Sequence, residues 1–178
     1  MDLQEFNGDM LYFEGEMDLE VECLIQQAAE NYGPESEGLL MKALAKAPEN
    51  LSVLVGLYRY YYYQHKYEKA LAIAYRVMKV VGGKIEFPSS WQDIEMRDVI
   101  TGLGYSFTQV RLYLFALKAA GYLLLRMGFY QKGRSMIEKV VAMDERDRIG
   151  AKLLLSILDN NTAEIIDFSV QKKLEACS

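Results

Sequence analysis

Residues 51–84 read LSVLVGLYRYYYYQHKYEKALAIAYRVMKVVGGK, and this stretch decides the expected fold. Its apolar residues recur every three or four positions, which is the spacing of a helix that buries one face, and there is very little strand-like alternation. Asn50 precedes the first apolar run as a helix cap, and the glycine pair at 82–83 follows the second run as a stop signal. The stretch therefore predicts two helices, 51–65 and 67–81, joined by a very short turn.

The same spacing continues outward in both directions, so we expect an all-α protein of about nine helices. Ser106 and Gln109 form a capping-box pattern at the start of the longest expected helix. The other expected helices are 18–31, 34–47, a short one that Ser90 caps and that runs through Val99, 106–127, 130–143, 148–158 and a last one behind Asn161.

The pattern of residues 51–84 recurs at a period of about 34 residues. Residues 114–147 place apolar or small residues at the same offsets, and residues 17–50 do so less regularly. The three sets are Leu54, Leu57, Tyr58, Tyr61, Tyr67, Ala70, Ala74 and Val77; then Leu117, Ala120, Gly121, Leu124, Tyr130, Gly133, Ile137 and Val140; and, in the degenerate unit, Glu20, Cys23, Leu24, Gln27, Ser36, Leu40, Ala43 and Pro48.

At these positions the chain resembles the tetratricopeptide repeat family. The resemblance implies an α-α superhelix, a right-handed solenoid of antiparallel helix pairs. Small residues are needed where two paired helices approach closely, and Ala70, Gly121 and Gly133 meet this need. Tyr58 and Glu20 depart from the family pattern, so the first unit is open to a second interpretation as a capping pair.

The repeat units also define the expected domain organisation. We expect an acidic N-terminal segment, 1–16, followed by a single domain, 17–178. Residues 85–113 fit no repeat and are expected to form an inserted helix and loop, and residues 148–178 are expected to cap the C-terminal end.

Charge is distributed unevenly along the chain. Residues 1–41 contain eleven Asp or Glu and no Lys or Arg, a net charge of −11, whereas residues 42–178 carry +6. Because the basic part contains no Lys/Arg cluster, we expect no nucleic-acid partner. The acidic front is open to three interpretations: a solvated helix face, a contact with another protein, or a segment, 1–16, that folds back into the chain's own basic groove.

The resemblance implies that the first helix of each pair lines a concave groove. The groove positions are basic and aromatic, so we expect an acidic or carboxylate-bearing peptide as the ligand. A simpler alternative is that the tyrosines wrap a buried helix and extend their hydroxyls to water. The residues expected to bind peptide are Val55, Arg59, Tyr62, Tyr63, Phe115, Lys118, Tyr122 and Arg126.

Several classes of chemistry find no support in the sequence. One histidine, His65, and two distant cysteines, Cys23 and Cys177, provide no zinc framework and no Cys-His pair. Cys23 falls on the apolar face of its expected helix and is therefore expected to be a small core residue. Gly102 and Gly104 follow no strand and precede no Gly-Lys-Ser/Thr, which argues against a nucleotide site. We therefore expect no metal, no cofactor and no enzymatic activity.

The chain also lacks the features of exported and membrane proteins. Its start, MDLQEFNGDM, has neither the basic nor the apolar region of a secretory signal. Its most apolar stretch, 112–125, contains Lys118 and is shorter than the roughly 18 apolar residues of a spanning helix. We expect a cytoplasmic protein with no membrane contact.

These observations favour a non-catalytic adaptor or chaperone-like binder of a partner's peptide segment. The alternative is a structural scaffold that associates with itself or is filled by its own N-terminus, as an accessory protein of a larger bacterial assembly such as secretion or nitrogen fixation. Exposed apolar residues on the last helix would favour this homo-oligomeric alternative, because terminal repeats need a polar outer face; these residues are Ile165, Ile166, Phe168 and Leu174.

Overall fold

The computed structural model describes residues 18–30 and 33–160 of the chain, and every regular element within them is a helix. This confirms the all-α prediction. The elements are α1 (Leu19–Glu30), α2 (Pro34–Lys46), α3 (Leu51–Tyr63), α4 (Tyr67–Lys84), the short 3-10 helix η2 (Trp91–Asp93), α5 (Met96–Tyr105), α6 (Phe107–Arg126) and α7 (Tyr130–Met143), and residues 152–160 are also helical.

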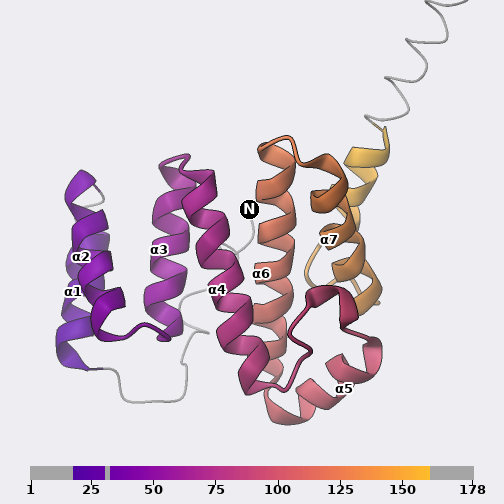
Figure 1. The fold of residues 1–178 in the computed structure, drawn as a ribbon, viewed down its shortest axis with the longest axis horizontal. Coiled ribbons are helices and arrows are strands. Elements are labelled where there is room, and N and C mark those ends of the chain that lie inside the picture. The colour runs from indigo at the N-terminus through magenta and orange to yellow at the C-terminus, as the bar shows by residue number, and fades with distance from the viewer. Residues whose placement is uncertain (1–17, 31–32, 161–178) are drawn as a thin grey trace, which may run out of the picture.

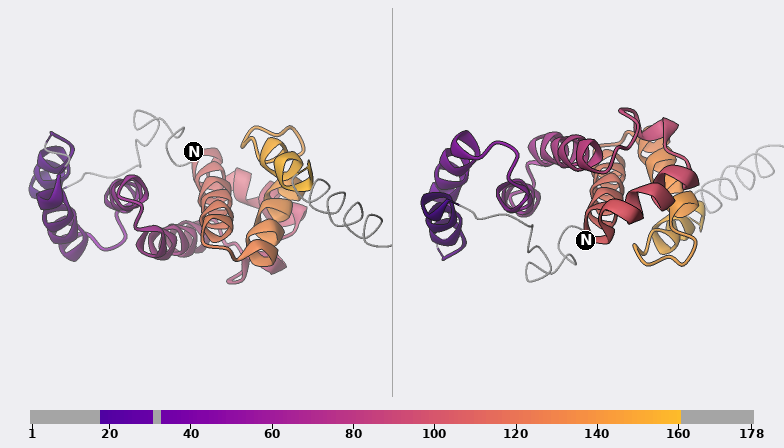
Figure 2. Two further views of the ribbon diagram at one scale, coloured as in Figure 1. Left: turned by 90° about the horizontal axis from the view of Figure 1, so that it is seen from above. Right: turned by 90° about the horizontal axis from the view of Figure 1, so that it is seen from below.

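The main helices stand side by side in chain order (Figure 1). Each packs against the next, from α1 through α4, after which α4 packs on α6 and α6 packs on α7. The shorter α5 contacts α6 and α7 and lies across one end of them. The views from above and below show that the row is elongated, with α1 and α2 at one end and α7 at the other (Figure 2).

Two predicted capping residues begin their helices as expected. The Asn50 side chain accepts the backbone N–H of Val53 at 3.1 Å, which fixes the start of α3. Ser106 Oγ accepts the backbone N–H of Gln109 at 3.3 Å at the start of α6. These local contacts explain why α3 and α6 begin where the sequence predicts.

Helix α4 is longer than predicted, because it continues through Gly82 and Gly83 to Lys84. Gly82 is buried, and a Cβ at this position would lie 3.2 Å from the ring of Tyr113 on α6. The glycine therefore permits α4 and α6 to pack closely rather than ending the helix. The prediction of a stop at the glycine pair was wrong.

The inserted helix also differs from its prediction. Ser90 Oγ accepts the backbone N–H of Gln92 at 3.3 Å, but this cap opens only the single turn of η2. The α-helix of the insertion begins at Met96 and runs to Tyr105, beyond the predicted end at Val99.

The cysteine of α1 lies outside the core. Val21 and Ala28 are buried, whereas Cys23 is exposed. The prediction that Cys23 is a core residue was therefore wrong.

The helix predicted at 148–158 occupies residues 152–160 instead. Asp147 and Gly150 have positive φ values of 50° and 68°, so the backbone turns before the helix begins. The Asp147 carboxylate accepts the backbone N–H of Ala151 at 2.9 Å at the start of this helix. The expectations for residues 1–16, 161–178 and Cys177 lie outside the described residues.

Helix α6 forms the centre of the core. Almost all of its residues between Val110 and Leu124 are buried, because α4 covers one side and α7 covers another. Within the described part of the chain, no helix combines the length and the apolar character needed to cross a membrane.

Candidate functional site

Three helix ends bring a group of tyrosines and one arginine together. Tyr62 lies in the last turn of α3, Tyr67 at the first position of α4, and Tyr122 and Arg126 at the end of α6. The Tyr62 ring centroid is 6.3 Å from that of Tyr67 and 6.3 Å from that of Tyr122. We call these four residues the tyrosine–arginine cluster.

Arg126 joins two helices of this cluster. Its guanidinium donates to the hydroxyl oxygen of Tyr122 at 3.0 Å and to that of Tyr67 at 2.9 Å. The same guanidinium lies 5.1 Å from the ring centroid of Tyr67, within the range of a cation–π contact. The Tyr67 hydroxyl is also 2.9 Å from Nδ1 of His65, to which it is able to donate its own hydrogen.

These contacts leave part of the guanidinium available. An arginine carries five N–H donors in a planar fork, and the tyrosines take two of them. Among the described residues the other donors of Arg126 have no hydrogen-bond partner, and the side chain is exposed. A carboxylate can therefore bind to this fork, with the positive charge already held in place.

Tyr62 stays uncharged over the physiological pH range. Burial and a hydrogen bond to Tyr122 raise the pKa of Tyr62 to about 12, and nearby Arg126 offsets this only in part. The hydrogen bond to Tyr122 raises the pKa of Arg126 above its already high value. The cluster therefore places the positive charge of Arg126 close to the neutral phenol of Tyr62.

Two further predicted residues lie on the same helix as Tyr62. Arg59 is half-buried, whereas Tyr63 leaves 48% of its surface accessible to solvent. Positions three and four apart share a helix face, so Arg59 lies on the same side of α3 as Tyr62 and Tyr63. Five of the eight predicted residues are thus at least partly exposed: Arg59, Tyr62, Tyr63, Tyr122 and Arg126.

The other three predicted residues, Val55, Phe115 and Lys118, are buried. Lys118 points to the turn after α7, where its Nζ donates to the carbonyl oxygen of Ile149 at 2.7 Å. This differs from the expected role, because a buried lysine bonded to the backbone does not offer an exposed charge to a peptide. Val55 and Phe115 are likewise part of the core and offer no exposed surface to a peptide.

Tyr67 and His65 were not among the predicted binding residues. Tyr67 occupies a position that the repeat pattern assigns to helix packing, yet its hydroxyl contacts both Arg126 and His65. The signal in the sequence is the short turn between α3 and α4, which places residue 67 beside the end of α3. His65 takes a φ of 56° in that turn.

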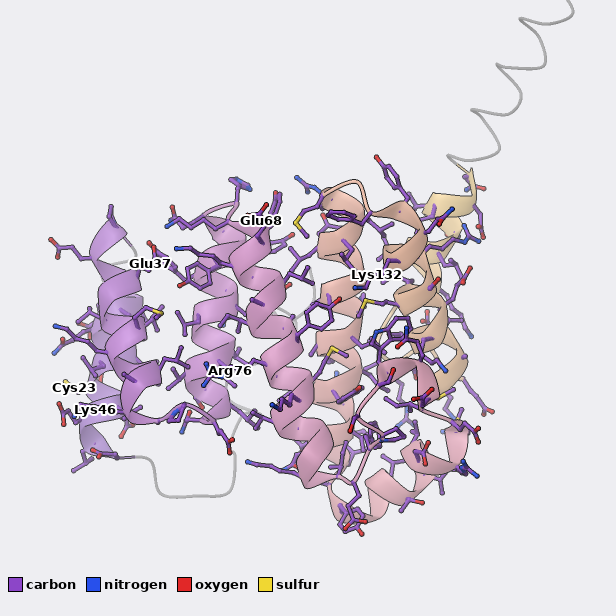
Figure 3. The ribbon with its side chains drawn as sticks, in the orientation of Figure 1. Cys23, Glu37, Lys46, Glu68, Arg76 and Lys132 are labelled. Carbon is purple, nitrogen blue, oxygen red and sulfur yellow. The ribbon has the colours of Figure 1, made fainter. Side chains whose placement is uncertain are left out.

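A second charged group joins α2 to the same turn. The carboxylate of Glu37, which is labelled on α2 in Figure 3, accepts hydrogen bonds from Lys66 Nζ at 2.6 Å and from Lys69 Nζ at 2.7 Å. These two hydrogen bonds lower the pKa of Glu37 to about 2. The turn that presents Tyr67 is thus connected to the preceding helix pair.

The described residues contain no group of three or more His, Cys, Asp or Glu placed to hold a metal ion. The chemistry of the tyrosine–arginine cluster is that of recognition: one fixed cation, hydroxyl groups and aromatic faces.

A comparison with known proteins finds a relative of this chain. No protein-family model matches the chain, and no solved structure matches it. A protein of Azotobacter chroococcum mcd 1, described as an uncharacterised 19.8 kDa protein in the nifW 5′ region, is 44% identical over 176 residues, which is 98% of each chain.

Proposed function

The chain belongs to one family with the uncharacterised 19.8 kDa protein of Azotobacter chroococcum, and we propose that it is a non-catalytic protein–protein interaction module. We further propose that its helix pairs form a right-handed superhelix of the tetratricopeptide type. The row of successively packed helices and the short turn between α3 and α4 support this architecture. So does the close approach of α6 and α7 at two glycines that the repeat pattern places there.

The ligand in this proposal is an extended or helical peptide segment of a partner protein that carries a carboxylate. Arg126 binds the carboxylate, Arg59 adds positive charge, and Tyr62, Tyr63 and Tyr122 contact the apolar parts of the peptide. The observation that carries the proposal is the position of Arg126, held by the Tyr67 and Tyr122 hydroxyls with donors remaining. Because the charge is already ordered, binding loses less side-chain entropy.

The name of the relative favours a particular context for this activity. That protein is placed in the nifW 5′ region, which supports the alternative role as an accessory protein of a larger bacterial assembly. We take the product of nifW from the source organism as the first candidate partner.

The test is affinity capture with the tagged full chain, followed by mass spectrometry and by direct titration of the nifW product. The variant Arg59→Glu, Arg126→Glu reverses charge in the site, and Lys42→Glu, Lys79→Glu reverses two exposed lysines elsewhere. Circular dichroism verifies that both variants fold. We expect the wild type and the lysine variant to retain the same partner and the arginine variant to lose it.

The conservative change Arg126→Lys separates fork geometry from charge. Lysine keeps the positive charge but cannot bind a carboxylate with two parallel N–H groups, so we expect affinity for the captured partner to fall by about tenfold. If all variants hold a partner equally, or capture only the protein itself, the peptide-binding proposal is wrong and the self-associating scaffold is favoured.

A further inference from the structure

An apolar groove lies at the opposite end of α6 from the tyrosine–arginine cluster. It has a volume of about 630 Å³, within the range of sites that bind ligands. Arg111 lines the groove, and 15 residues of helix, about 22 Å, separate it from Arg126. The groove lies between α5, the first half of α6 and the turn after α7, and its lining is Met96, Val99, Ile100, Leu103, Phe107, Val110, Arg111, Leu114, Met143, Asp144, Glu145, Arg146, Arg148 and Ile149.

One wall of the groove is an exposed apolar stripe. Met96, Ile100 and Leu103 follow each other at intervals of four and three residues and so share one side of α5, and Phe107, the first residue of α6 after the extended Ser106, lines the same groove. The solvent-accessible fractions of Ile100, Leu103 and Phe107 are 64%, 42% and 51%. Contiguous exposed apolar residues mark interaction sites more often than single ones do.

The groove also contains an arginine nitrogen that lacks a partner. Nε of Arg111 is buried and has no hydrogen-bond partner in the described structure, while the guanidinium lies 5.3 Å from the ring centroid of Phe115. A buried donor without a partner carries a cost in free energy, and a shift of the Arg111 side chain toward an acceptor in the groove removes this cost. The site therefore favours a ligand that presents an anionic oxygen beside apolar groups.

The rim of the groove has a small excess of positive charge. Arg111, Arg146 and Arg148 line it together with two acids, Asp144 and Glu145. The Asp144 carboxylate is already engaged, because it accepts the backbone N–H of Ile149 at 2.6 Å. Among the described residues, no ion pair involves any of the three arginines.

We infer that this groove docks an amphipathic helix of a partner protein, with an acidic residue of that helix placed on Arg111. The apolar residues of α5 extend over about two helical turns, and a partner helix with apolar residues at i, i+3, i+4 and i+7 presents an apolar face of similar length to such a groove. The charge excess selects an acidic rather than a basic partner helix. This assigns a role to the inserted residues 85–113, and it does not depend on the peptide site at Arg126.

The test uses a displayed library of amphipathic helical peptides. Their apolar stripe is fixed, and the positions beside it vary among Glu, Gln and Lys. The library is selected on the full chain and counter-selected on Leu103→Asp. We expect enrichment of Glu beside the stripe. Absence of enrichment, or enrichment of Lys, overturns the proposal.

The best enriched peptide is then titrated by fluorescence anisotropy against three variants whose fold is checked by circular dichroism. We expect Leu103→Asp to abolish binding, and Arg111→Gln to weaken it by about tenfold and to remove the preference for Glu over Gln. Leu153→Asp changes a leucine that is 64% exposed and lies outside the groove, so it should bind like the wild type. Equal affinity for the wild type and Leu103→Asp contradicts the proposal.

Sedimentation velocity of the protein alone tests a second copy as the occupant. We expect no self-association that depends on this surface. A concentration-dependent dimer that Leu103→Asp abolishes and Leu153→Asp retains would assign the groove to a second copy and overturn the partner-helix proposal.

Discussion

Gly121 and Gly133 bring α6 and α7 into backbone contact. A Cβ added to Gly133 would lie 2.7 Å from the carbonyl oxygen of Gly121, and a Cβ added to Gly121 would lie 3.0 Å from the carbonyl oxygen of Gly133. Real Cβ atoms essentially never approach another heavy atom more closely than 3.0 Å, and here the neighbour is backbone rather than a flexible side chain. The two glycines therefore set the distance between the helices.

The first prediction is that Gly133→Ala destabilises the protein by about 1–3 kcal/mol, because the added methyl group forces the helices apart in a well-packed core. This cost exceeds the gain of about 0.5–1 kcal/mol that alanine brings to a helix interior. Urea unfolding followed by circular dichroism measures the difference.

Gly38→Ala is the matched control. Gly38 also lies inside a helix, α2, but a Cβ there meets nothing within 4 Å. We expect this variant to be about 0.5–1 kcal/mol more stable than the wild type. Equal effects of the two substitutions would show that the glycine contact does not set the packing of α6 on α7.

Local signals in the sequence predicted the helices well where a side chain fixes a helix start. Asn50 and Ser106 each accept the expected backbone N–H, so those starts follow from a few neighbouring residues. Near the end of α4, by contrast, Gly82 lies against the ring of Tyr113, which is far away in the sequence. No local pattern distinguishes a glycine that ends a helix from one that permits a close contact.

The candidate site was predictable to a similar extent. The resemblance to the tetratricopeptide repeat family assigned Tyr62, Tyr122 and Arg126 to one groove, and the structure places the Tyr122 side chain beside the other two. The resemblance did not identify Tyr67, whose role arises from the meeting of three helix ends. It also placed Lys118 at the surface. The structure buries this residue, because it is covered by the turn after α7, which lies 31 residues further along the chain.

The second prediction concerns stability in acid. The pKa of Glu37 is lowered to about 2 by hydrogen bonds to Lys66 and Lys69, so its contribution to stability is present above its ordinary pKa of 4.5 and is lost as the pH falls toward 2. The wild type should exceed Glu37→Gln in stability at pH 6, by less than about 1 kcal/mol because the lysines are exposed. The difference should shrink steadily between about pH 5 and pH 2.

Urea midpoints at a series of pH values measure this difference. Glu49→Gln removes an exposed carboxylate on the surface and serves as the control. A difference between the wild type and Glu37→Gln that does not change with pH would argue against the ion pairs as its source.

The third prediction concerns stability in alkali. The folded-state pKa of Tyr62 is raised to about 12, above the ordinary value of 10, so the unfolded chain loses this proton first as the pH rises. The contribution of the neutral phenol is therefore complete below pH 10 and is lost between about pH 10 and pH 12. The stability of the wild type should fall more steeply in this range than that of Tyr62→Phe.

Denaturant unfolding between pH 8 and pH 12 tests this expectation, with Tyr130→Phe as the control because Tyr130 is 67% exposed. Parallel stability curves for the wild type and Tyr62→Phe would mean that the cluster does not hold the Tyr62 phenol neutral.

The fourth prediction concerns the inserted segment, which Lys139 of α7 ties to the body. Its Nζ donates to the carbonyl oxygen of Gln92 at 2.7 Å and to that of Ile94 at 3.0 Å. Lys139→Met keeps the length of the side chain and removes both hydrogen bonds, so local opening of the loop before α5 becomes easier. Hydrogen exchange of the amides in residues 91–95 should accelerate by about tenfold, which corresponds to about 1.4 kcal/mol of local stability.

Lys42→Met, on the distant α2, should leave that exchange unchanged. The exchange of α3 amides reports global unfolding in all three proteins and should stay constant. Acceleration everywhere in Lys139→Met would indicate loss of global stability, and no acceleration at 91–95 would show that other contacts hold the insertion.

Because α5 supplies the apolar stripe of the groove, local loosening in Lys139→Met should also weaken binding of the library-selected helical peptide while binding at Arg126 is retained.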